Sequence, residues 1–122
     1  MQNLFLNAQS NGHEILVTGK QDTQGANNHL TSHTYMQVEG DVMINAGIKA
    51  GDTIIVDRSI PAKTGKIVIA VLNDAMLIRR YEQNGYRIRL LPETDALAPI
   101  EVDTRNCRFY IWGVVTHVMR KV

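Results

Sequence analysis

GDVMINAGIKAGDTIIVDRSIPAKTGKIVIAVLNDAMLIRRY, residues 40–81, is the stretch of sequence that decides the fold. It contains short runs of β-branched and aliphatic residues, TIIVD at 53–57 and KIVIAVL at 66–72, separated by residues that favour turns. Val and Ile are enriched in strands, whereas Gly, Asn and Asp tolerate the backbone angles of tight turns. The pattern predicts hairpins, and the almost wholly apolar run at 66–72 predicts a strand covered on both faces.

Similar runs continue toward the end of the chain, at MLIRRY (76–81), YRIRLL (86–91) and FYIWGVVTHV (109–118). Within 86–91, residues alternate, so Arg87 and Arg89 are expected on one face and Tyr86, Ile88 and Leu90 on the other. One short helix is predicted around Met43–Ile48, closed by Gly47. We therefore expect a mostly β, compact fold of short, strongly bent strands.

The first 34 residues differ in composition, because they are rich in Asn, Gln, Gly, Ser and Thr. Only Leu4-Phe5-Leu6 and Ile15-Leu16-Val17 offer much apolar surface to bury, which is too little to offset the entropy of ordering the segment. We predict a flexible arm with one or two short strands at 1–34 and a β domain at 35–122. The arm lacks the two amphipathic helices of a helix-turn-helix, so no sequence-specific DNA-reading element is expected.

Composition excludes several classes of protein. The chain has 122 residues, enough for one domain, and its hydrophobic share of 44% is ordinary for a globular protein. A net charge of +1 gives no general reason to bind nucleic acid or anionic membrane. No apolar run approaches the roughly 20 residues that span a bilayer, and the lone Cys107 suits a reducing compartment. We expect a cytoplasmic protein without a cofactor.

Three boxes resemble the C-terminal domain of the LexA and UmuD family of serine–lysine self-cleaving proteins. They are residues 40–81, LLPETDALAPIEV at 90–102 and IWGVVTHV at 111–118, which follow one another in the family's order and spacing. The resemblance covers roughly the last two-thirds of the chain. It implies a compact β fold, homodimerisation and a part in the SOS response to DNA damage, where a RecA filament stimulates self-cleavage.

The catalytic dyad of that family is replaced at both positions in this sequence. The resemblance puts Val42 where the nucleophilic serine follows Gly-Asp, and Arg79 where a neutral lysine acts as the base. Valine carries no nucleophilic atom, and a guanidinium stays protonated under ordinary conditions, so it cannot accept the proton of a hydroxyl. We predict a pseudo-peptidase with no catalytic residues. The alternative is a misaligned box with the nucleophile elsewhere, although Ser10, Ser32 and Ser59 all lie outside any box that resembles a nucleophile site.

The cleavage target is missing as well, because family members are cut at Ala-Gly or Cys-Gly bonds and the arm offers only Gly25-Ala26. The leading interpretation is therefore a dimeric accessory subunit, like processed UmuD, of an error-prone translesion polymerase of the UmuC type. The runner-up is a regulatory decoy that forms heterodimers with a LexA- or UmuD-like protein and alters its self-cleavage. An active peptidase with an unrecognised nucleophile is the third reading.

Three further groups of residues can be interpreted either as functional sites or as ordinary surface or core residues. His29 and His33 have the four-residue spacing of a metal pair, but no helical pattern or third ligand accompanies them, so we read them as solvated. Four arginines are expected on neighbouring strands: Arg79, Arg80, Arg87 and Arg89. They form either a phosphate-binding patch or, as we favour, a set in which Arg79 fills the lysine position with an acid such as Asp41 or Glu39 as its partner, while the others are solvated. The aromatic stretch of the last strand is either core or dimer interface; its residues are Phe109, Ile111 and Trp112.

Overall fold

A computed structural model describes the backbone of residues 15–21 and 33–122, and side chains from His33 onward. Most of the predicted arm, and with it His29 and Gly25-Ala26, lies outside the described residues. Where the chain is described it is mostly β, as the sequence predicts. Its eight strands are β1 (Ile15–Gln21), β2 (His33–Val38), β3 (Thr53–Asp57), β4 (Ile67–Leu72), β5 (Ala75–Asn84), β6 (Arg87–Leu91), β7 (Ile100–Val102) and β8 (Phe109–Met119).

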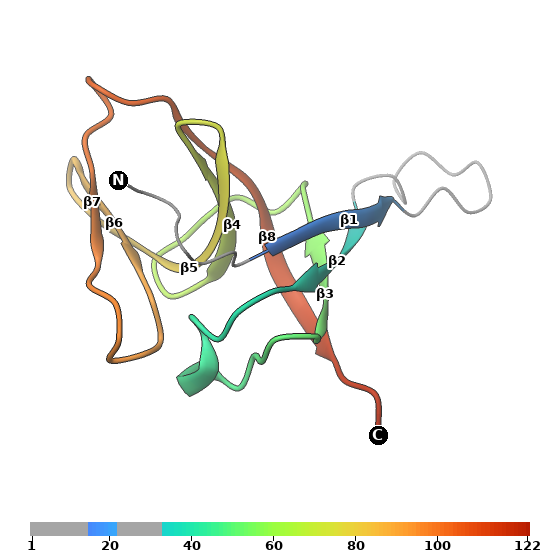
Figure 1. Ribbon diagram of the computed structural model, residues 1–122. Coiled ribbons are helices and arrows are strands. Elements are labelled where there is room, and N and C mark those ends of the chain that lie inside the picture. Colours follow the sequence, from blue (N-terminus) through green and yellow to red (C-terminus); the bar gives the residue numbers. More distant parts are fainter. Residues whose placement is uncertain (1–14, 22–32) are drawn as a thin grey trace.

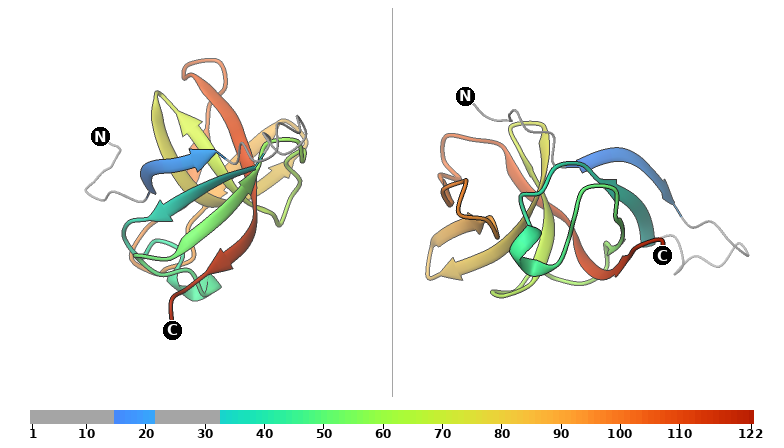
Figure 2. Two further views of the ribbon diagram at one scale, coloured as in Figure 1. Left: turned by 90° about the vertical axis from the view of Figure 1, so that its right-hand side faces the viewer. Right: turned by 60° about the horizontal axis from the view of Figure 1, so that its bottom comes forward.

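The strands form one antiparallel sheet in the order β1-β2-β3-β8-β4-β5-β6-β7. Figure 1 shows β8 running between the two parts of the sheet, with β2 and β3 on one side and β4 to β7 on the other. The register shifts where β8 pairs with β3 and again where it pairs with β4. Such bulges increase local twist, and the two views of Figure 2 show how strongly the sheet curls.

The curled sheet encloses two apolar clusters. One gathers around Ile54, Ile69 and Ile78, and the other around Val68, Leu90 and Val114, all of them almost completely buried. Because β4 has neighbouring strands on both sides and contributes to both clusters, the residues at 68–71 are all buried. This burial confirms the prediction made from the run at 66–72.

The predicted helix near Met43 is a single 3-10 turn, η3 (Ile44–Ala46), which ends at Gly47 in the left-handed conformation. The prediction for Tyr86 was wrong, because this residue lies in the turn before β6 and its side chain is fully exposed. The rest of that strand follows the predicted alternation, with Arg87 exposed and Leu90 completely buried.

Candidate functional site

The loop that carries Val42 connects β2 to β3 and is held by hydrogen bonds from its own residues. Ile44 N donates to Asp41 O at 3.2 Å, and Ala50 N donates to the Asp41 carboxylate at 3.0 Å. These bonds fold the loop back on itself around the 3-10 turn. The side chain of Val42 is half-buried and packs against the cluster that contains Ile69 and Ile78.

Arg79 lies on β5, where it pairs in register with Val68 of β4. Only 4% of the residue is exposed, and Nη1 donates to the backbone oxygen of Ile78 at 2.9 Å. A buried charged group requires compensating interactions, because leaving water is costly. The guanidinium is thus an integrated part of the interior and not a solvated side chain.

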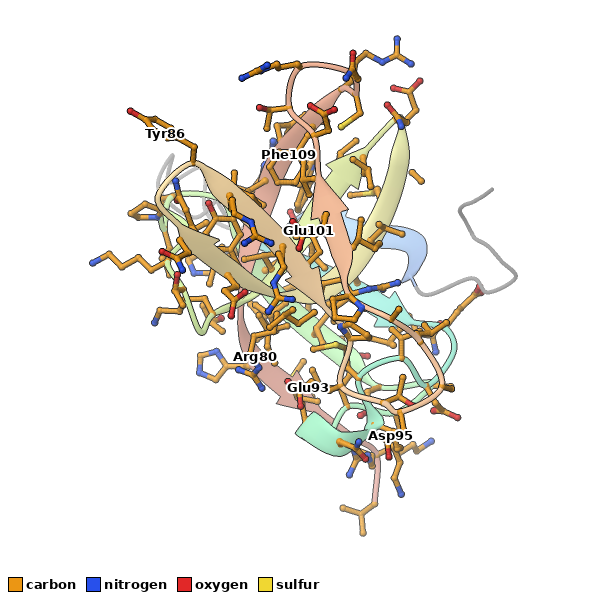
Figure 3. The ribbon with its side chains drawn as sticks, turned by 90° about the vertical axis from the view of Figure 1, so that its left-hand side faces the viewer. Arg80, Tyr86, Glu93, Asp95, Glu101 and Phe109 are labelled. Atoms are coloured by element: carbon orange, nitrogen blue, oxygen red, sulfur yellow. The ribbon has the colours of Figure 1, made fainter. Side chains whose placement is uncertain are left out.

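Glu93 connects the loop of Val42 to β5. Its backbone N donates to Val42 O at 2.8 Å, and its backbone O accepts from Asn45 N at 2.8 Å. Its carboxylate accepts from Arg80 Nε at 2.8 Å, and Arg80 Nη1 donates to Gly65 O at 2.8 Å. Figure 3 shows Arg80 and Glu93 side by side. The backbone bonds of Glu93 thus join the loop to the segment after β6, and its ion pair with Arg80 joins that segment to β5.

The ion pair of Arg80 with Glu93 was missed by the sequence interpretation, although both residues fall inside boxes that were recognised. Antiparallel pairing of Arg80 with Leu91 brings the residues just after β6 close to β5. That register cannot be read from either box alone. The only signal in the sequence was that Arg80 and Glu93 carry opposite charges.

Ser59, which the sequence places outside any box that resembles a nucleophile site, belongs to a cluster of its own with Asp57 and His33. Its hydroxyl donates to Asp57 Oδ1 at 2.6 Å, and the other oxygen of Asp57 lies 3.2 Å from His33 Nε2. In a serine–histidine–aspartate triad the imidazole contacts the serine and the carboxylate orients the imidazole. Here the carboxylate and not the imidazole accepts the Ser59 hydroxyl, so the arrangement differs from that of a triad.

The residues of β8 that the sequence offers as core or dimer interface pack against the two apolar clusters. Trp112 packs against the first cluster, whereas Phe109 and Ile111 pack against the second. Arg58 covers the Trp112 ring at 4.1 Å from its centroid and donates from Nε to the Trp112 backbone oxygen at 3.0 Å. All three apolar side chains are half-buried. Their role as an interface stays a prediction.

Among the residues with described side chains, no group of three or more His, Cys, Asp or Glu comes together in a way that could hold a metal ion. Cys107 is half-buried, and burial raises the pKa of its thiol. A raised pKa keeps the thiol protonated, which is the unreactive form. In the part of the chain that the structure describes, no helix is long and apolar enough to cross a membrane.

Comparison with known proteins identifies the family. The sequence model of the Peptidase S24-like family matches residues 6–116. This chain belongs to the Peptidase S24-like family. The LexA repressor of Geotalea uraniireducens (strain Rf4) is 39% identical over 88 residues, which are 72% of this chain and 44% of that protein. LexA repressor 1 of Xanthomonas campestris pv. campestris is 42% identical over 86 residues, or 70% of this chain and 42% of that protein.

A third relative, the LexA repressor of Thiobacillus denitrificans, is 34% identical over 85 residues, again 70% of this chain and 42% of the repressor. The chain thus spans less than half the length of these S24-like relatives. The resemblance to the LexA and UmuD family and the expectation of its β fold are both confirmed.

Proposed function

We propose that this chain is a non-proteolytic, dimer-forming accessory subunit, like processed UmuD, of an error-prone translesion polymerase in the SOS response. The observation that carries the proposal is Val42 in the position after Gly40-Asp41. Its loop is ordered by backbone hydrogen bonds with Glu93. Membership of the S24-like family supports the link to DNA damage. In this proposal, the loss of self-cleavage leaves the surfaces that bind a second copy and the polymerase in place. Both partners act in the cytoplasm.

The absence of peptidase activity is part of this proposal. Self-cleavage needs a nucleophile and a neutral base next to it. Val42 supplies no such atom, and a guanidinium such as that of the buried Arg79 stays protonated under ordinary conditions, so it cannot act as the base. Prolonged incubation at pH 10 should leave the chain intact on a gel. A truncated product with a defined new terminus would support the third reading, an unrecognised nucleophile.

The outer face of β2, β3 and β8 supports the dimer. Met36 and Ile54 point into the core, so their neighbours Tyr35 and Ile55 lie on the opposite face, together with Met119. Tyr35 is 39% exposed and Met119 is 41% exposed. Members of the LexA and UmuD family dimerise. We propose that a second copy of this chain covers these apolar side chains.

The test in cells is deletion of the gene followed by complementation. Reversion of a reporter allele after DNA damage should fall to the undamaged level in the deletion strain and return when the wild-type chain is supplied. Affinity capture from damaged cells, followed by mass spectrometry, should recover a Y-family polymerase. Unchanged reversion in the deletion strain contradicts the accessory role.

The second candidate function is a decoy for a LexA- or UmuD-like protein, and the similarity to LexA repressors over 70–72% of the chain favours it. Similar β interfaces can accept either an identical or a related partner. Mixing this chain with such a repressor should then give mixed dimers in light scattering and a changed rate of self-cleavage. Two separate homodimer populations count against the decoy.

A further inference from the structure

A polar groove lies between the turn that precedes β4 and the β5–β6 hairpin, away from the loop of Val42. The two walls are fixed to each other, because Thr64 Oγ1 accepts from Gln83 N at 3.0 Å and donates to Gln83 O at 3.2 Å. Gly65 N adds a bond to Tyr81 O at 2.9 Å. The groove has a volume of about 460 Å³ and is lined by Thr64, Glu82, Gln83, Asn84, Arg87 and Arg89.

The two arginines of the groove are held in place by carboxylates. Arg87 Nη2 lies 3.0 Å from Glu101 Oε2, and Arg89 Nε lies 2.7 Å from Glu82 Oε1 and 3.9 Å from Glu101. The hydrogen bond that Arg89 donates to the Glu82 carboxylate raises the pKa of Arg89, so this guanidinium stays charged under ordinary conditions. Each arginine keeps donors beyond those used in its ion pair, because a guanidinium carries five N–H groups.

Two lysines give the groove an excess of positive charge. Lys63 and Lys66 flank Thr64 in the turn, and both are exposed. Neither forms an ion pair with another residue that the structure describes. The arginines are balanced by Glu82 and Glu101, so among the described side chains the two lysines leave about two positive charges without a carboxylate partner next to Thr64. A ligand with at least two negative charges fits this balance.

Tyr86 stands at the tip of the hairpin, directly before the groove residue Arg87. Its relative exposure is 102%, and Figure 3 shows its ring pointing away from the body of the molecule. A fully exposed aromatic side chain contributes nothing to the core of this fold. It does offer a flat face on which another planar ring can stack.

We propose that this groove binds the phosphodiester backbone of a single-stranded nucleic acid, with Tyr86 stacking on one base. Proteins that hold single strands without sequence preference combine a positively charged groove that follows the backbone with aromatic side chains on which bases stack. An acidic protein segment would use the same cations but gives no use to an exposed ring beside them. The inference does not depend on the accessory role, since it rests on residues outside the loop of Val42.

The affinity should be modest and sensitive to salt. A phosphate must share Arg87 with Glu101 and Arg89 with Glu82, so the dissociation constant should fall in the range of non-specific binding, about 1–100 µM. Each phosphate contact to a single strand contributes about 0.7 to the slope of log affinity against log salt. Two contacts removed together should lower the slope by about 1.4.

The test is fluorescence anisotropy of a labelled 20-nucleotide single strand of mixed sequence, titrated with the full chain between 50 and 200 mM salt. Tyr86→Ala should weaken binding at least about fivefold, the lower end of the stacking contribution per base. The double variant Lys63→Gln/Arg87→Gln should show the reduced salt slope. The matched control Lys49→Gln/Lys121→Gln also removes two exposed cations but leaves the groove unchanged. All these side chains are exposed, so the variants should fold.

Unlabelled poly-glutamate in the same assay distinguishes the two kinds of anionic ligand. The proposal expects poly-glutamate to compete poorly with the oligonucleotide at equal charge. It is overturned if the wild type does not bind at 50 mM salt, or if the control pair loses as much affinity as the groove pair. It is also overturned if Tyr86→Ala binds normally and poly-glutamate displaces the strand, because the site then takes acidic protein segments.

Discussion

Arg120 donates to both oxygens of Asp52, at 2.7 Å from Nε and 2.6 Å from Nη2, and so ties the residue after β8 to the residue before β3. The same guanidinium donates to Gly47 O at 2.8 Å, at the end of the 3-10 turn. Only 3% of the Asp52 side chain is exposed. A single arginine thus fastens the C-terminal end of the sheet to the loop that carries Val42.

Stability should therefore fall in acid through Asp52. The hydrogen bonds from Arg120 hold the pKa of this carboxyl below its usual value. A carboxyl with a lowered pKa stabilises the folded state above the unfolded value, about 3.9, and the contribution is lost as pH falls through the lower folded value. The melting temperature should drop below about pH 4. Asp52→Asn should melt lower than wild type at pH 7 and show a flatter profile in acid; an unchanged acid profile would contradict this assignment.

Gly113→Ala should destabilise the protein by about 1–3 kcal/mol, the usual cost of overpacking a core. A Cβ at this position of β8 would lie 2.5 Å from Val56 Cγ1 and 3.3 Å from the Asp57 backbone oxygen. Val56 is completely buried and cannot move aside easily. Urea unfolding measures the loss. The control His117→Ala, at an exposed position of the same strand, should change stability by less than about 0.5 kcal/mol.

The proposed dimer face makes a prediction about assembly. Met119→Glu places a charge among exposed apolar side chains, and burying it against a second copy is unfavourable. We expect the apparent mass in light scattering to fall from dimer to monomer at micromolar concentration, with the melting of the monomer fold retained. Leu97→Glu is the matched control, because Leu97 is 43% exposed between β6 and β7, outside β2, β3 and β8. Dimers that persist in Met119→Glu would place the interface elsewhere.

The double variant Val42→Ser/Arg79→Lys recreates the residue types of the family's dyad. We expect little cleavage in cis, less than a few per cent of chains after a day at pH 9–10, because the arm contains Gly25-Ala26 and no Ala-Gly or Cys-Gly bond. Gel electrophoresis with mass spectrometry measures the products. Rapid cutting within the arm would mean that the sequence upstream of Gly40 has been misread.

The strands were predictable because their signals are local. The run at 53–57 coincides with β3, and Asn73-Asp74 adopts the positive φ angles expected of a hairpin turn. The order of strands was not predictable from periodicity, because β8 enters between β3 and β4 through contacts far apart in sequence. Tyr86 was misplaced for a related reason: alternation defines two faces of a strand but does not say at which residue the strand begins.

The candidate site, too, could be predicted from the sequence only in part. The assignment of Val42 and Arg79 to the dyad positions rests on the boxes around them and stays a prediction. The ion pair of Arg80 with Glu93 depends on the pairing of β5 with β6, which no single box encodes. The groove at Thr64 is a further product of tertiary contacts, since its walls come from segments that meet only in the folded sheet.

The central place of β8 also has a consequence for synthesis on the ribosome. β3 and β4 follow each other along the chain, yet each pairs with β8, more than 35 residues further on. While residues 109–119 are still inside the exit tunnel, one edge of β3 and one edge of β4 have no partner strand, and both apolar clusters are open to water. Pairings over such separations form slowly and leave strand edges prone to aggregation in the meantime. The nascent chain is therefore most vulnerable just before β8 emerges, and that is the interval in which a chaperone would protect it best.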